Sequence, residues 1–325
     1  VTSLVVGWVA WAVIPGLPLA AAFALGAVVS PPDAVAATTI ARRVGMPRRL
    51  VSILEGESLL NDATALVGLR TAATAMSATA VTVWSISGGF LLAVGGGLLI
   101  GVAAAVLMGV VRRRVRDPVL DTTLSFVAPF VAYLPAEAIH ASGVLAVVVA
   151  GLLLGHKSPV IQSASSRLSE QINWRTVQFL LENAVFLLIG LQVSDTVRAA
   201  RDLDISDRRT ILVCVAVLLA TIGVRIGWVF AVTAAYRLGP RRMRERAWQW
   251  RYAALVSWSG MRGVVTLAAA FALPEQTPHR DLLVLAALAV VGGTLLVHGT
   301  TLPWLVRRLG LPGPNPAEDA LEEAA

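Results

Sequence analysis

Ten apolar runs, separated by short polar connections, take up most of this 325-residue sequence. A helix needs about 20 mostly apolar residues to cross the hydrocarbon core of a bilayer. Scanning at that length gives Val1 to Ile14, Leu19 to Ala41, Leu50 to Met76, Val83 to Val111, Val119 to Leu134, Ser142 to Gly155, Trp174 to Val193, Ile211 to Tyr236, Ala253 to Leu273 and Leu282 to Val306. Lipid offers no hydrogen bonds to the backbone, so each run must satisfy its own amides within a helix. The sequence therefore predicts an all-α polytopic membrane protein with about ten spans.

Composition and charge support this class and exclude others. Only 14% of the residues are charged, against roughly 25% in an average soluble domain, which excludes a soluble enzyme. The net charge of +7 comes mainly from arginines in the connections, where membrane topology places them, so it does not indicate nucleic-acid binding. If the connections alternate sides, one set holds 19 of the 27 basic residues and the other holds five. This asymmetry predicts a cell-membrane protein with the basic connections and both chain ends in the cytoplasm.

The two ends of the chain carry further expectations. The sequence opens at Val1 within an apolar run and has no basic segment or cleavage site before it, so we expect residues upstream in the natural protein. Residues 312–325 are Pro-rich and then acidic, which predicts a disordered cytoplasmic tail. Residues 1–311 form the predicted transmembrane domain.

A Ser-Pro-Pro-Asp sequence interrupts the second apolar run. Pro31 and Pro32 remove two backbone donors, so the helix should break where Ser30 and Asp33 lie. A broken membrane helix exposes carbonyl oxygens and two half-helix ends, and such ends coordinate cations in transporters. The simpler interpretation is a proline kink with a snorkelling Asp33.

The third run carries most of the ionisable groups found at membrane depth, each of which costs at least about 3 kcal/mol on insertion scales. Helical spacing of about 100° per residue places Glu55, Ser58 and Asp62 on one face, with Asn61 alongside. Glu57 points about 140° away from Asp62 at this spacing. The two acidic groups should therefore have different tasks.

An arginine lies at depth in the ninth run. Gly260 and Gly263 flank Arg262, which loosens the helix around a permanent positive charge. That charge needs a carboxylate, and we expect Glu57 to be its partner. Asp62 would then be left free to titrate.

The other polar groups do not suggest a metalloenzyme. Cys214 is the single cysteine, and the histidines His140, His156, His279 and His298 lie near span ends or in connections, so no transition-metal site or other cofactor is expected. Glu182 and Asn183 favour a structural polar contact between helices, with pathway lining as the alternative. Hard alkali cations prefer oxygen ligands. The Asp62 carboxylate, the Ser58 hydroxyl and carbonyls near Pro32 would supply these to Na⁺.

Two segments resemble the signature regions of sodium/proton antiporters of the cation:proton antiporter-1 family: SPPDAVAATTIARRVGMPRRLVSILEGESLLNDATALV, from Ser30 to Val67, and SWSGMRGVVTLA, from Ser257 to Ala268. The resemblance implies an inverted-repeat fold with broken crossing helices. It also implies that Asp62 binds cation and proton alternately, that Ser58 is a cation ligand, and that Asn61 is the neutral partner marking the electroneutral branch.

The resemblance assigns the remaining residues as well and shows two departures. Glu57 and Arg262 resemble the family's structural ion pair, and Asp33 resembles the acidic residue of the broken helix. The family usually has Thr before this Asp and Pro after it, whereas this sequence has Pro32 and Ala34, so a hydroxyl ligand is replaced by backbone oxygen. The family also has about three further N-terminal spans, one of which often helps to form a homodimer.

The leading prediction is an antiporter that exchanges cytoplasmic Na⁺, or alternatively K⁺ or Li⁺, for external H⁺ by alternating access. Cation and proton would compete for Asp62. A different class of protein, a membrane-embedded aspartyl protease, would use Asp33 and Asp62 as its dyad. The sequence is also compatible with a channel or with a transport-inactive fragment.

Overall fold

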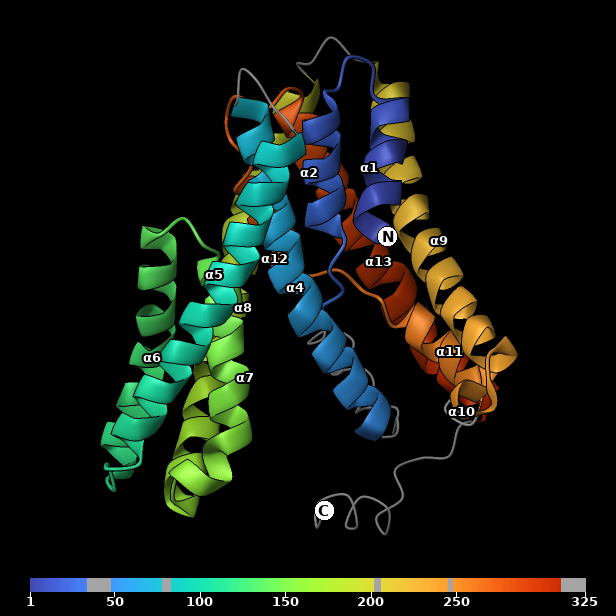
Figure 1. Ribbon diagram of the computed structural model, residues 1–325. Coiled ribbons are helices and arrows are strands. Elements are labelled where there is room, and N and C mark those ends of the chain that lie inside the picture. The colour runs from blue at the N-terminus through green and yellow to red at the C-terminus, as the bar shows by residue number, and fades with distance from the viewer. Residues whose placement is uncertain (34–47, 78–82, 202–205, 245–247, 311–325) are drawn as a thin grey trace. The chain divides into compact units, whose positions relative to one another are not determined.

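The computed structural model describes residues 1–33, 48–77, 83–201, 206–244 and 248–310. Every regular element in these ranges is an α-helix, as predicted (Figure 1). The helices are α1 (Thr2–Val13), α2 (Leu19–Val29), α4 (Arg48–Ser77), α5 (Val83–Arg112), α6 (Pro118–Ala138), α7 (Gly143–Ile161), α8 (Ala164–Arg201), α9 (Asp207–Leu238), α10 (Arg241–Arg244), α11 (Trp250–Trp258), α12 (Val264–Phe271) and α13 (Arg280–Leu309).

Six stretches of the described helices are long and apolar enough to cross a bilayer. They are residues 88–112, 118–138, 143–161, 164–199, 207–238 and 280–309. The multi-pass character is therefore supported, but the count of about ten spans is not confirmed. Helix α4 is not among them because it carries several charged residues. Helices α2, α11 and α12 are not among them because each is too short to cross a bilayer by itself. The predicted tail falls outside the described residues.

The chain divides into two compact units, residues 1–65 with 192–325 and residues 66–191. In the first unit, α1 packs against α2 and α9, and α13 packs against α9 and α12. The α1–α2 contact depends on glycine, because a Cβ added to Gly26 would overlap the backbone oxygen of Ser3. Leu255, Met261 and Leu302 lie at the centre of an apolar core around α11 and α13.

The second unit contains α5, α6 and α7 together with the parts of α4 and α8 that fall in residues 66–191. Its core is made almost wholly of alanine, including Ala104, Ala132, Ala146 and Ala150. In a bilayer the hydrophobic effect does not drive helices together, so they associate through close packing, and small residues let their backbones approach closely. This explains why α5 and α7 lie side by side in Figure 1.

Two helices of the first unit are interrupted. α2 ends at Val29, and residues 31–33 are not helical, so the break predicted at Pro31 and Pro32 is confirmed; the rest of that predicted run, residues 34–41, lies outside the described ranges. The ninth predicted run is divided into α11 and α12 by residues 259–263. The loosening expected at Gly260 and Gly263 is thus a complete interruption.

Candidate cation-binding site

The two interruptions contact each other. The backbone N–H of Asp33 donates to the carbonyl of Met261 at 2.7 Å. The Asp33 carboxylate lies against Gly263, the N-cap of α12, where an added Cβ would overlap its Oδ2. The N-terminus of a helix carries a partial positive charge. The crossing therefore places a carboxylate beside the positive end of a half-helix.

Arg262 provides the opposite charge at the same crossing. Its side chain is 1% exposed; its Nε donates to the carbonyl of Val29 at 2.7 Å, and its Nη1 donates to the carbonyl of Gly260 at 2.9 Å. Val29 is the last residue of α2, and Gly260 follows α11. Helix C-termini carry partial negative charge. Backbone carbonyls at two half-helix ends thus bind the guanidinium.

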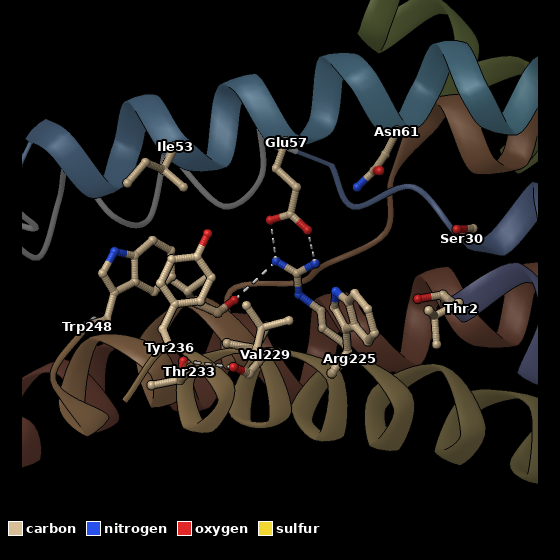
Figure 2. A pocket seen from close by; sticks show the side chains of 14 residues that line it. Thr2, Ser30, Ile53, Glu57, Asn61, Arg225, Val229, Thr233, Tyr236 and Trp248 are labelled. Carbon is tan, nitrogen blue, oxygen red and sulfur yellow. Dashed lines mark hydrogen bonds and ion pairs between the residues drawn. The ribbon is translucent and has the colours of Figure 1, made fainter. Parts of the chain in front are cut away.

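Glu57 pairs with a residue that the sequence analysis did not single out. Arg225 of α9 binds it with both terminal nitrogens, Nη1 to Oε1 at 2.7 Å and Nη2 to Oε2 at 3.0 Å (Figure 2). Arg225 Nη2 also donates to the carbonyl of Val256 in α11 at 3.1 Å.

The expected contact between Glu57 and Arg262 is therefore corrected. Glu57 leaves α4 on the side that faces α9, whereas the bonds of Arg262 are made to backbone carbonyls. The sequence contained a signal for the true partner, since Arg225 is the one charged residue within the apolar run Ile211 to Tyr236. An arginine at that depth needs a partner.

The oxygen groups of α4 lie next to the crossing. The buried Ser58 hydroxyl donates to the carbonyl of Pro32 at 2.7 Å. Asp62 is half-buried and lies within electrostatic range of both Asp33 and Arg262. Of the residues predicted to share its face, Ser58 is buried and Glu55 is exposed. The structure thus gathers Pro32, Asp33, Ser58 and Asp62 in one place, while their role in ion binding remains a prediction.

A cavity of about 580 Å³ within the first unit is lined by Ser30, Glu57 and Asn61, which are chain neighbours of these groups. Figure 2 shows Asn61 and Glu57 on one helix, Arg225 and Tyr236 on another, and Ser30 at the end of α2. The rest of the lining is mostly apolar and aromatic, and it includes Ile53, Trp228, Val229, Val232, Trp248 and Val256. The residue that precedes Asp62 therefore faces an accessible space.

The available donors suit a hard cation. Among the residues that the structure describes, no group of three His, Cys, Asp or Glu side chains could hold a metal ion. Carboxylate, hydroxyl and carbonyl oxygens are what the crossing presents, and alkali cations favour such ligands.

Two other expectations need correction. His298 does not lie near a loop, because it is 1% exposed within α13, with its ring 4.8 Å from that of Trp258. Glu182 and Asn183 join no two helices in the described part of the chain: Glu182 accepts from Gln178 and Asn183 donates to the carbonyl of Phe179, both within α8. Each side chain makes its hydrogen bond within one turn of its own helix.

Comparison with known sequences finds a matching family and several relatives. The transmembrane sodium/hydrogen exchanger family matches residues 1–308. An uncharacterized Na⁺/H⁺ exchanger of Mycobacterium tuberculosis (strain ATCC 25618 / H37Rv) is 35% identical over 96% of this chain and 58% of its own length. A sodium, potassium, lithium and rubidium/H⁺ antiporter of Bacillus subtilis (strain 168) is 31% identical over 94% of this chain and 48% of its own length. The chain thus spans about half of the length of these relatives.

Comparison with solved structures supports the fold. The sodium proton antiporter MjNhaP1 from Methanocaldococcus jannaschii, solved at pH 8, matches with a TM-score of 0.68 over 92% of this chain and 75% of that one. Sequence identity in the match is 15%, so the likeness concerns the fold. The antiporter fold expected from the sequence is therefore confirmed.

Proposed function

The chain belongs to the transmembrane sodium/hydrogen exchanger family, and we propose on this basis that it exchanges Na⁺ for H⁺ across the cell membrane. The observation that carries the proposal is the crossing of two interrupted helices beside Asp62, joined by the bond from Asp33 N–H to the carbonyl of Met261 at 2.7 Å. The fold match to an antiporter supports the same class.

The proposed chemistry is competition for one carboxylate. When Asp62 is ionised, its oxygens can hold a cation together with the Ser58 hydroxyl, whose hydrogen already points to the carbonyl of Pro32. A proton on the same carboxylate discharges it without a cation. The site can change its exposure from one side of the membrane to the other when Asp62 holds a cation or a proton. When Asp62 is ionised and empty, the uncompensated charge makes that movement too costly. Asn61 adds no second charge, so one Na⁺ would exchange for one H⁺.

The other charges at the crossing have a supporting role in this scheme. Arg262 holds the ends of α2 and α11 through their carbonyls, and Glu57 neutralises Arg225. Because the guanidinium groups of Arg262 and Arg225 are bound in this way, Asp62 is the acidic group of α4 at the crossing that can alternate between a cation and a proton. Asp33 lies beside the α12 N-terminus, whose partial positive charge stabilises its carboxylate.

The identity of the cation is open between Na⁺, K⁺ and Li⁺. The Bacillus subtilis relative carries a name that includes sodium, potassium, lithium and rubidium, while other relatives are named Na⁺/H⁺ exchangers. We propose Na⁺ as the principal substrate, with K⁺ and Li⁺ tested beside it.

The competing classes receive less support. A protease dyad of Asp33 and Asp62 would leave the deeply buried Arg262 without a role in the chemistry, and the relatives are named as exchangers. A homodimer of the longer protein, a cytoplasmic C-terminus and residence in the cell membrane are proposals that accompany the transport function. An inactive fragment remains an outcome of the experiment below.

The experiment uses proteoliposomes that contain the chain and a pH-sensitive dye. Addition of Na⁺ should move protons, and Asp62→Asn should abolish this flux while the variant keeps the thermal midpoint and elution profile of the wild type. Thr64→Val serves as the control, because among the described residues the exposed Thr64 hydroxyl bonds to carbonyls of its own helix alone. Wild-type flux in Asp62→Asn would refute the site. Absence of flux in the wild type would favour the inactive fragment.

A further inference from the structure

A second cavity, of about 470 Å³, lies within the 66–191 unit among α5, α6, α7 and α8. Part of its wall is apolar and is formed by Ala128, Pro129, Val147, Ala150 and Leu154. The remainder is polar and includes Arg112, Ser158, Gln162, Arg167, Glu170 and Gln171. The cavity is therefore amphipathic, and none of its lining takes part in the proposed ion site.

A buried arginine lies at the polar end. Arg112 is 4% exposed; its Nε donates to Asp121 Oδ1 at 2.7 Å and its Nη2 donates to Glu170 Oε2 at 2.6 Å. Gln162 Nε2 donates to the other oxygen of Asp121 at 2.8 Å and also to Glu170 Oε2, so it holds both acids in place. Arg112 Nη1 makes no hydrogen bond to any residue that the structure describes, so this arginine keeps a donor for a ligand.

A second arginine and two carbonyls offer further partners. Arg167 uses Nη1 to donate to the carbonyl of Gln162 at 3.1 Å, and its other nitrogens have no partner in the described part of the chain. Pro129 and Pro159 lie inside α6 and α7. Proline has no N–H, so the carbonyls four residues earlier, those of Ser125 and Gly155, lose their helical donors. Both residues line the cavity.

The surroundings are strongly basic. Residues 112–121 and 156–175, which carry the polar end, contain seven Lys and Arg side chains against three acidic ones. From the distribution of basic residues, we expect this end to lie at the cytoplasmic leaflet. Anionic lipids give that leaflet a negative surface potential, which attracts such clusters by about 1 kcal/mol per basic residue.

We propose that this cavity binds an anionic phospholipid whose headgroup also carries hydroxyl groups, as phosphatidylglycerol does. The phosphate accepts hydrogen bonds from Arg112 and Arg167. The headgroup hydroxyls donate to the freed carbonyls of Ser125 and Gly155. The acyl chains leave along the apolar wall near Leu154. A zwitterionic lipid lacks the net charge, and a simple phosphate lacks both the hydroxyls and the acyl chains.

The test is lipid binding by the purified chain in detergent, followed by native mass spectrometry and by the thermal midpoint. Phosphatidylglycerol, phosphatidylcholine and free glycerol phosphate are titrated in parallel. Gly155→Leu fills the cavity, and it should fold because a Cβ at Gly155 meets nothing within 4 Å. Gly190→Leu is the matched control, since Gly190 is equally open but does not line the cavity.

We expect the wild type and Gly190→Leu to bind phosphatidylglycerol at least tenfold more tightly than phosphatidylcholine. Gly155→Leu should lose this preference, and Arg167→Gln should weaken it severalfold. Unchanged phosphatidylglycerol binding in Gly155→Leu overturns the assignment of the site. Equal binding of the two lipids overturns the role of charge, and equal stabilisation by free glycerol phosphate overturns the choice of a lipid. None of these readouts depends on transport, so failure of the proposed exchange leaves this inference standing.

Discussion

Removing the partner of Glu57 should destabilise the first unit measurably. Arg225→Met deletes a bidentate ion pair whose side chains are 8% and 31% exposed. Breaking a fully buried pair costs about 3–5 kcal/mol, and an exposed pair contributes about 0–1 kcal/mol. Glu57 is partly solvated, so we expect a loss of about 2–3 kcal/mol in the free energy of unfolding, between these limits.

A double-mutant cycle isolates the pair. Glu57→Gln and Arg225→Met are measured singly and together by denaturant titration in mild detergent, with the thermal midpoint as a second readout. If the residues are partners, the double variant should be about 2 kcal/mol more stable than the sum of the single effects predicts, because neither charge is left alone.

The same cycle with Arg262→Met discriminates between the two possible partners. Arg262 makes its side-chain bonds to the carbonyls of Val29 and Gly260, so its coupling to Glu57 should be much smaller than that of Arg225. A larger coupling with Arg262 would refute the pairing described above and restore the one expected from sequence.

Three further predictions concern the crossing and its neighbours. Apparent Na⁺ affinity should weaken as pH falls, by up to about tenfold per unit once protons dominate Asp62, and transport against Na⁺ concentration at equal pH on both sides measures this; a constant affinity would place proton action elsewhere. Gly263→Ala should displace Asp33 and reduce exchange. Gly292→Ala is the control and should leave the flux intact, because a Cβ at Gly292 meets nothing within 4 Å. Equal flux in the two variants would contradict the close contact between Asp33 and Gly263. His298→Phe should raise the free energy of unfolding by about 1–3 kcal/mol, because both ring nitrogens of His298 are buried without a partner in the described residues; a clear loss in denaturant titration would reveal a bond that the ring needs.

The sequence by itself determined the class of the protein. Apolar runs of bilayer length admit only helices, and Pro31 with Pro32 was enough to end α2, because two missing amides and ring clashes cannot be absorbed within a helix. The candidate ion site could also be found from sequence, since Ser58, Asn61 and Asp62 lie within about one turn of α4 and charged groups at that depth are rare.

Tertiary structure decided which groups became partners. Periodicity gives the direction in which Glu57 leaves α4, but it does not say which helix lies there; only the packed unit places α9, and with it Arg225, against that face. The same holds for Arg262. Its guanidinium binds backbone carbonyls that are available to it only because two helices are interrupted and cross. Local sequence fixes where a helix ends, whereas the contact of two ends 228 residues apart, Asp33 with Met261, depends on the whole fold.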